Sequence, residues 1–265
     1  MTDVSYQFDH RFPITVMRLW GELTVTNASM VRDAALEALV EEPTSMIIDL
    51  TRVESADEPA LQFLPGVAAQ AAAWPGTSLL VCAPPGIADS LTQISEGGFT
   101  VHPSFAAALS IAAADPVPLR MHQRLEPTVH APRAARELAA EACAAWDLPR
   151  AVVPAEIIAS ELVTNAVRHA GTTIDLRITH REEELRISVQ DRDPALARLR
   201  APSETDDHGR GLLIVDSVAH RWGCEPVGGG KVVWAAVQVS PQPAEDLVGT
   251  PREPARDTFE AVEDG

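Results

Sequence analysis

The sequence predicts two domains, an α/β domain followed by an α+β domain whose sheet is mainly antiparallel. Short apolar runs alternate with helical patterns through the first part of the chain, which is typical of a layered α/β fold. After Asp115-Pro116-Val117-Pro118 come two long helical patterns and then paired strands. Two prolines within three residues block a helix and remove backbone donors, so we place the boundary there.

The elements of the first domain are predicted from periodicity and turn residues. Ile14–Trp20 is rich in β-branched and aromatic residues and predicts a strand that ends at Gly21. Thr26 or Asn27 can cap a helix that runs to about Leu39, since both side chains offer an oxygen to free N–H groups. Further strands are expected over 46–50, 78–82 and 99–101, and further helices over 59–73, 87–94 and 105–113.

The second domain opens with helical patterns over 132–146 and 154–169. The rest of this domain predicts a strand pair over 173–179 and 184–190, a helix over 211–219 and an alternating strand over 231–239. Helices packed on one face of an antiparallel sheet are the simplest architecture for this set of elements.

The domain organisation is completed by two segments without apolar periodicity. The last residues are rich in proline and acidic side chains and predict a disordered, solubilising tail. We expect the first domain over 1–115, a linker over 116–129, the second domain over 130–239 and the tail over 240–265.

Composition limits the classes of partner. The formal charge is −17, from 21 basic and 38 acidic residues, which argues against direct nucleic-acid binding because phosphate contacts need clustered Lys and Arg. Three well-separated cysteines predict reduced thiols. The N-terminus has neither a basic start nor a long apolar run, and no apolar stretch is long enough to span a membrane. We therefore expect a cytoplasmic protein without a membrane partner.

Polar side chains recur on one face of the helix predicted over 154–169. Glu161, Asn165 and His169 lie four residues apart, beside an apolar stripe. A neutral amide next to a carboxylate suits a hard cation that keeps waters and phosphate oxygens as further ligands. Within hydrogen-bond reach of a hydroxyl, Glu161 can also accept its proton. Taken alone, the same pattern fits a solvent-exposed polar stripe, with His169 in a structural role.

Two later segments favour a nucleotide site. A predicted strand ends on Asp191, whose carboxylate is a good acceptor for the exocyclic amine of adenine. His208-Gly209-Arg210-Gly211-Leu212 then opens an apolar helix, where glycines let the backbone approach phosphates and free N–H groups face an anion. The order and spacing of the three segments carry more weight than any one of them.

With these motifs, 132–239 resembles the ATPase superfamily shared by gyrase and sensor histidine kinases. Within it, the segment is most similar to bacterial anti-sigma-factor serine/threonine kinases. Ser160–Ala170 (SELVTNAVRHA) resembles their asparagine box, and Gly230–Trp234 (GKVVW) resembles their closing strand.

The resemblance implies ATP and Mg²⁺ as cofactors and a role for each matching residue. Glu161 would be the general base, Asn165 the magnesium ligand and Asp191 the adenine contact. The ATP-binding loop would be formed by Gly209, Arg210, Gly211 and Leu212, and charge on the transferred phosphoryl group would be stabilised by Arg210, Arg198 or Arg200.

One segment departs from the family pattern. The family usually has Asp-x-Gly-x-Gly where this chain has Asp191-Arg192-Asp193-Pro194-Ala195. Asp191 is kept but both glycines are missing, which puts the backbone's approach to the base in question.

The first domain resembles the STAS fold of anti-sigma-factor antagonists over Val16–Ala113, where Leu19–Leu23 (LWGEL) fits the family's first hairpin. In that family a serine in the turn Asp-Ser-Ser-Gly-Leu is phosphorylated. Here the turn reads Asp57-Glu58-Pro59-Ala60-Leu61, so Glu58 occupies the phosphorylatable position. Glu58 can imitate phosphoserine in part, because it places a negative charge near a helix start. Alternatively, Asp57 or Glu58 simply caps the turn.

Two functions remain open on the sequence. One is a serine/threonine kinase that phosphorylates a separate STAS-domain antagonist and regulates a sigma factor. The other is a non-catalytic, nucleotide-dependent interaction switch in transcription regulation. A sensor histidine kinase fragment has less support because no histidine-bearing dimerisation helix precedes the site. The resemblance also implies a homodimer.

Overall fold

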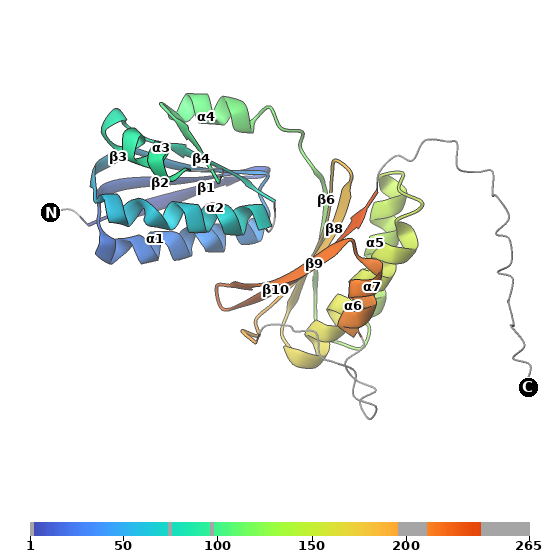
Figure 1. Ribbon diagram of the computed structural model, residues 1–265. Helices are drawn as coiled ribbons and strands as arrows, with labels where there is room; N and C mark the ends of the chain where they lie inside the picture. The colour runs from blue at the N-terminus through green and yellow to red at the C-terminus, as the bar shows by residue number, and fades with distance from the viewer. Residues whose placement is uncertain (1–2, 74–75, 96–97, 196–210, 240–265) are drawn as a thin grey trace, which may run out of the picture.

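The computed structural model describes residues 3–73, 76–95, 98–195 and 211–239, which form two layered domains side by side (Figure 1). Both expected fold classes are confirmed. The first domain is an α/β layer structure and the second packs helices on an antiparallel sheet.

The first domain is built on a five-stranded sheet in the order β1-β2-β3-β4-β5. Strands β2 to β5 run parallel, and β1 pairs antiparallel with β2 at one edge. The strands are β1 (Ser5–Arg11), β2 (Ile14–Leu23), β3 (Ser45–Ala56), β4 (Ser78–Cys82) and β5 (Thr100–His102).

Helices cover both faces of this sheet. Alternate residues of β2 point to opposite faces, so Met17 enters the main core whereas Val16 enters a smaller cluster on the other side. The main core is covered by α1 (Val25–Ala38), α2 (Phe63–Ala73) and α3 (Pro85–Ile94), and the smaller one by α4 (Phe105–Ala112). Two 3₁₀-helices, η1 (Leu39–Glu41) and η2 (Glu58–Gln62), follow α1 and precede α2.

The second domain is a five-stranded sheet in the order β6-β7-β8-β10-β9, with every pair antiparallel. One face carries the helices α5 (Ala131–Ala145), α6 (Val152–His169) and α7 (Gly211–Val218) (Figure 1). The strands are β6 (Leu119–Leu125), β7 (Ile174–Arg181), β8 (Glu184–Asp191), β9 (Arg221–Val227) and β10 (Gly230–Gln238).

The other face of the second sheet packs against the first domain. In β10, Val233 and Ala235 belong to the core under α5 and α6, whereas Val232, Trp234 and Ala236 belong to the main core of the first domain. Antiparallel sheets often leave one face to water. Here part of that face is buried by the neighbouring domain.

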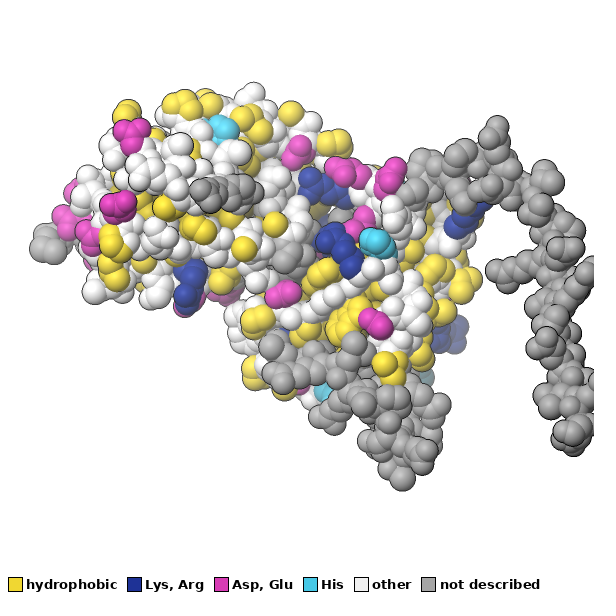
Figure 2. Space-filling view, viewed as in Figure 1, with side chains coloured by type: hydrophobic (Ala, Val, Ile, Leu, Met, Phe, Trp, Pro, Cys, Tyr) yellow, Lys and Arg dark blue, Asp and Glu magenta, His cyan; other side chains and the backbone are white. Residues whose placement is uncertain are grey.

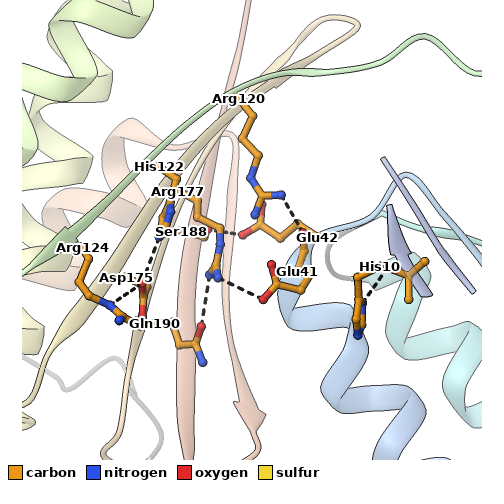
Figure 3. A network of polar contacts seen from close by, with 11 residues as sticks. His10, Glu41, Glu42, Arg120, His122, Arg124, Asp175, Arg177, Ser188 and Gln190 are labelled. Atoms are coloured by element: carbon orange, nitrogen blue, oxygen red, sulfur yellow. Dashed lines mark hydrogen bonds and ion pairs between the residues drawn. The ribbon is translucent and has the colours of Figure 1, made fainter. Parts of the chain in front are cut away.

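A buried acid anchors this contact. Glu42 follows η1 in the left-handed region, with φ of 50°, and is 6% exposed. Its carboxylate accepts a short hydrogen bond from Ser188 Oγ and a second, 3.4 Å bond from Thr179 Oγ1. Figure 3 shows Glu42 reaching from the first domain towards Ser188 and Arg120. Arg120 donates to the Glu41 carbonyl at 2.9 Å, and burial lowers the pKa of its guanidinium although the charge of Glu42 opposes that shift.

Further polar contacts surround the junction. Figure 2 shows arginine and acidic side chains gathered between the two domains. Arg181 donates to the Gly76 carbonyl at 3.0 Å, and Gln70 donates to Glu225 at 2.7 Å. The contact therefore combines apolar burial with hydrogen bonds from several strands of the second sheet.

Most expected elements are found, but three expectations need correction. The N-cap of α1 is Thr24, whose N–H donates to Asn27 Oδ1 at 2.8 Å, so the expected cap at Thr26 or Asn27 was misplaced. The expected linker over 116–129 contains β6, which pairs with β7. The sequence patterns did not predict the edge strands β1, β6 and β9. The expected tail over 240–265 lies outside the described residues.

The cysteines and helices add two observations. Cys82 and Cys143 are buried, and burial raises the pKa of the Cys82 thiol to about 12. Among the described residues, no helix combines the length and apolar character that a membrane crossing requires.

The buried acid gives a first prediction. We expect Glu42→Ala to lower the free energy of unfolding by about 2–4 kcal/mol, because Ser188 loses its buried partner and Arg120 loses a compensating negative charge. Glu41→Ala is the matched control. The Glu41 side chain is 57% exposed and lies 3.8 Å from Arg177, so a change below about 1 kcal/mol is expected. Chemical denaturation measures both variants, and equal losses would contradict a dominant role for Glu42.

Candidate nucleotide site

The first part of the site is a polar face of α6. Ile158, Leu162 and Ala166 pack into the core against the sheet. Glu161 and Asn165 are offset from that stripe and half-buried, while His169 is exposed in the last turn. The four-residue spacing therefore places Glu161 and Asn165 one above the other beside the core, as expected.

The first residue of α7 lies directly against these two side chains. A Cβ atom on Gly211 would come within 2.7 Å of Glu161 Oε2 and 3.3 Å of Asn165 Oδ1. Only a residue without a side chain lets the backbone come this close to both. Leu212 is half-buried and packs against the core of the domain, with Val215 fully buried behind it. The structure thus brings together Glu161, Asn165 and the N-terminus of α7.

The second part of the site lies where β8 ends. Leu185, Ile187 and Val189 point into the core under the helices, so Asp191 lies on the same helix-facing side. Asp191 is 3% exposed, and its Oδ1 accepts a hydrogen bond from Lys231 Nζ at 3.0 Å. The strands fix this pair, because Lys231 is directly opposite Asp191 in the register of β10 and β8.

The loop after β8 is held by the same lysine. Lys231 Nζ also donates to Asp193 Oδ2 at 3.0 Å and to the Asp193 carbonyl at 3.1 Å. The Asp193 N–H donates back to Asp191 Oδ1 at 2.9 Å, and the Ala195 N–H donates to Asp193 Oδ1 at 3.1 Å. The segment that lacks the family's glycines is therefore organised around an ammonium group.

These contacts shift two pKa values in opposite directions. Burial alone lowers the pKa of Lys231, but the hydrogen bonds and charges of Asp193 and Asp191 outweigh it, so that pKa is raised. The hydrogen bond from Lys231 lowers the pKa of Asp193, and the charge of His169 adds to this effect. The lysine contribution to stability is lost as pH rises through the raised pKa, and the aspartate contribution is lost on acidification.

A divalent cation fits the helix side of the site. Asn165 supplies a neutral oxygen and Glu161 an anionic one, and the backbone at the start of α7 lies directly against both side chains. The described residues contain no group of three or more His, Cys, Asp or Glu side chains able to hold a metal by themselves. Such a site matches Mg²⁺, which keeps several waters and binds through one or two protein oxygens and substrate phosphates.

The other residues predicted from the sequence lie apart from this site or outside the described part of the chain. Gly209, Arg210, Arg198, Arg200 and His208 lie outside the described residues. Asp57 and Glu58 are exposed in the first domain, where Asp57 is the N-cap of η2. No capping hydrogen bond from the Asp57 side chain is found within the described residues. Lys231 was missed as a site residue, although it is the only lysine among the 265 residues.

Two family models match the chain. The STAS domain model matches residues 5–108, and the histidine kinase-like ATPase domain model matches residues 125–237. The chain therefore contains an N-terminal STAS domain followed by a histidine-kinase-like ATPase domain.

Individual proteins resemble parts of the chain. An uncharacterized protein of Streptomyces coelicolor is 34% identical over 101 residues, which cover 36% of this chain and 94% of that protein. An anti-sigma factor antagonist from Mycobacterium paratuberculosis is 21% identical with a TM-score of 0.36, and the match covers 42% of this chain and 95% of that one. The RsbU and RsbW domains of a Mycobacterium tuberculosis protein are 20% identical with a TM-score of 0.37, covering 46% and 32% of the two chains.

The close approach of Gly211 to Glu161 gives a second prediction. We expect Gly211→Ala to weaken Mg–ADP binding at least about tenfold, because its Cβ would displace the Glu161 carboxylate. The fold should persist, since the displaced atom is the end of a flexible side chain. Gly66→Ala in α2 is the control, because nothing lies within 4 Å of its Cβ. It should leave binding unchanged and stabilise the helix by about 0.5–1 kcal/mol. Calorimetry measures the affinity of both variants for Mg–ADP, and thermal denaturation measures their stability. Unaltered binding by Gly211→Ala would contradict the close approach of Gly211 to Glu161.

Proposed function

We propose that the ATPase domain binds ATP with Mg²⁺ and phosphorylates a serine on a separate STAS-domain antagonist, as an anti-sigma-type kinase that regulates a sigma factor. The observation that carries the proposal is the approach of the Gly211 backbone to Glu161 and Asn165. It joins a proton acceptor, a cation ligand and a helix N-terminus in one place. The match to the histidine-kinase-like ATPase model supports nucleotide binding.

Each residue has a distinct task in this reaction. Asn165 would hold the cation, which supplies charge neutralisation to the phosphates. Glu161 would accept the hydroxyl proton of the substrate serine as the serine Oγ forms a bond to the γ-phosphorus. The bond between that phosphorus and the bridging oxygen breaks, and ADP leaves. The N–H groups at the start of α7 would bind phosphate oxygens.

The substrate serine belongs to another protein in this proposal. The turn of the chain's own STAS domain carries Glu58 in place of the serine. The Asp57 N–H donates to the Leu23 carbonyl, which places the turn near the start of α1. Glu42, which anchors the contact with the ATPase domain, lies beyond the other end of α1. A helix of 14 residues spans about 21 Å, so the turn lies well away from Glu42.

A second candidate function is a nucleotide-dependent interaction switch without phosphoryl transfer. The loop after β8 favours it, because both glycines of the family pattern are replaced and Lys231 holds the segment through Asp191 and Asp193. In that case nucleotide binding would change the capture of a partner, and Glu161 would have no role in turnover.

A transfer assay separates the two functions. Full-length protein is incubated with γ-labelled ATP, Mg²⁺ and candidate STAS-domain substrates, and compared with Glu161→Gln. We expect label on the substrate with the natural protein and a loss of at least about 100-fold with the variant, because the general base is removed.

Glu156→Gln is the matched control for the assay. Glu156 lies on the same helix, a little over one turn before Glu161, and is expected to leave transfer unchanged. Nucleotide-dependent capture of the substrate without transfer of label would replace the kinase proposal with the switch.

A further inference from the structure

The single lysine of the sequence lies at the base end of the proposed nucleotide site. Of the 21 basic residues, Lys231 is the only one that is not arginine. Its side chain is 6% exposed, and it points to the helix-facing side of the sheet with Val233 and Ala235. A compact ammonium at this place has different chemistry from the planar, multiply donating guanidinium used elsewhere in the chain.

The ammonium group is fully satisfied. It has three N–H donors, and three acceptors lie within 3.1 Å, namely Asp191 Oδ1, Asp193 Oδ2 and the Asp193 carbonyl. The exocyclic amine of adenine is also an N–H donor, and the Asp191 carboxylate at the strand end is the acceptor expected for it. Lys231 donates to Oδ1 of that carboxylate and would therefore compete with a purine amine for it.

Asp193 makes this arrangement reversible. Its side chain is more exposed than that of Asp191, with 25% against 2% of the surface accessible. If Lys231 releases Asp191, its ammonium keeps the carboxylate and the carbonyl of Asp193 as partners. The ammonium then keeps a counter-charge, and Asp191 keeps the hydrogen bond from the Asp193 N–H.

We propose that Lys231 and Asp193 form a gate on the nucleotide site. In the closed state Lys231 binds both aspartates, and in the open state it binds Asp193 alone while Asp191 accepts the amine of an aminopurine nucleotide. This inference rests on the proposed nucleotide binding and adds a positioning residue and a form of regulation to it. It also gives a function to the acidic residue that stands where the family has glycine.

Substitutions on the two sides of the gate have opposite effects. Lys231→Met removes the competitor, so Mg–ADP affinity should rise about tenfold or more. Asp193→Asn weakens the alternative partner of Lys231 and should lower Mg–ADP affinity. Lys231→Arg keeps a competing cation and serves as the matched control, so it should not show the gain in affinity expected for Lys231→Met. A purely structural lysine would give weaker binding in every variant.

A change of the nucleotide base separates an effect on the gate from an effect on the rest of the site. Inosine diphosphate has the same phosphates as ADP but lacks the exocyclic amine. The gain in Lys231→Met is therefore expected for Mg–ADP and not for Mg–inosine diphosphate. Titration calorimetry on the full chain measures both nucleotides, and circular dichroism shows whether each variant is folded.

The outcomes separate the gate from the proposed function. Binding of Mg–ADP by the natural protein, with no gain in Lys231→Met and no loss in Asp193→Asn, would overturn the gate and leave nucleotide binding intact. If Lys231→Met does not fold, the substitution Asp193→Asn at the more accessible of the two aspartates decides alone. Absence of Mg–ADP binding by the natural protein and by every folded variant at millimolar concentration would overturn both.

Discussion

Strand β10 is buried at every position from Gly230 to Val237, and both domains depend on the different surroundings of its two faces. Val232, Trp234 and Ala236 complete the core of the STAS domain, whereas Val233 and Ala235 complete the core of the ATPase domain. Because successive side chains of a strand point to opposite faces, one strand can belong to two cores. A shift of one residue in its register would exchange these two sets and destroy both contacts.

The same alternation separates two buried charges on opposite faces of the sheet. Ser188 of β8 points to the STAS domain and binds Glu42, while Asp191 of the same strand points to the helices and binds Lys231. A buried charge is retained only where it is paired or hydrogen-bonded, and both meet that condition. The acid fixes the position of one domain against the other. The lysine fixes the loop at the nucleotide site, so the domain contact and the site share two neighbouring strands.

Sequence patterns predicted the parts of this structure that have a strong local signal. The central strands and long helices have clear apolar periodicity, and the i, i+4 spacing of Glu161 and Asn165 placed both on one helix face. The edge strands β6 and β9 have mixed polar sequences, and β9 contains both Gly223 and Pro226. They become strands by pairing with β7 and β10. The contact of Lys231 with Asp191 joins residues 40 positions apart through strand register, which no local pattern reveals.

The most direct test tracks the only lysine by NMR. Lysine labelled with ¹³C at Cε gives one side-chain signal, and its pH titration reports the pKa of Lys231 with and without nucleotide. Saturating Mg–ADP is predicted to move the signal and to lower that pKa towards its ordinary value, because the ammonium exchanges two acidic partners for Asp193 alone. Mg–inosine diphosphate should leave the lysine signal and the pKa of Lys231 close to their nucleotide-free values. A signal and pKa that stay unchanged while calorimetry shows Mg–ADP bound would contradict competition between Lys231 and the base for Asp191.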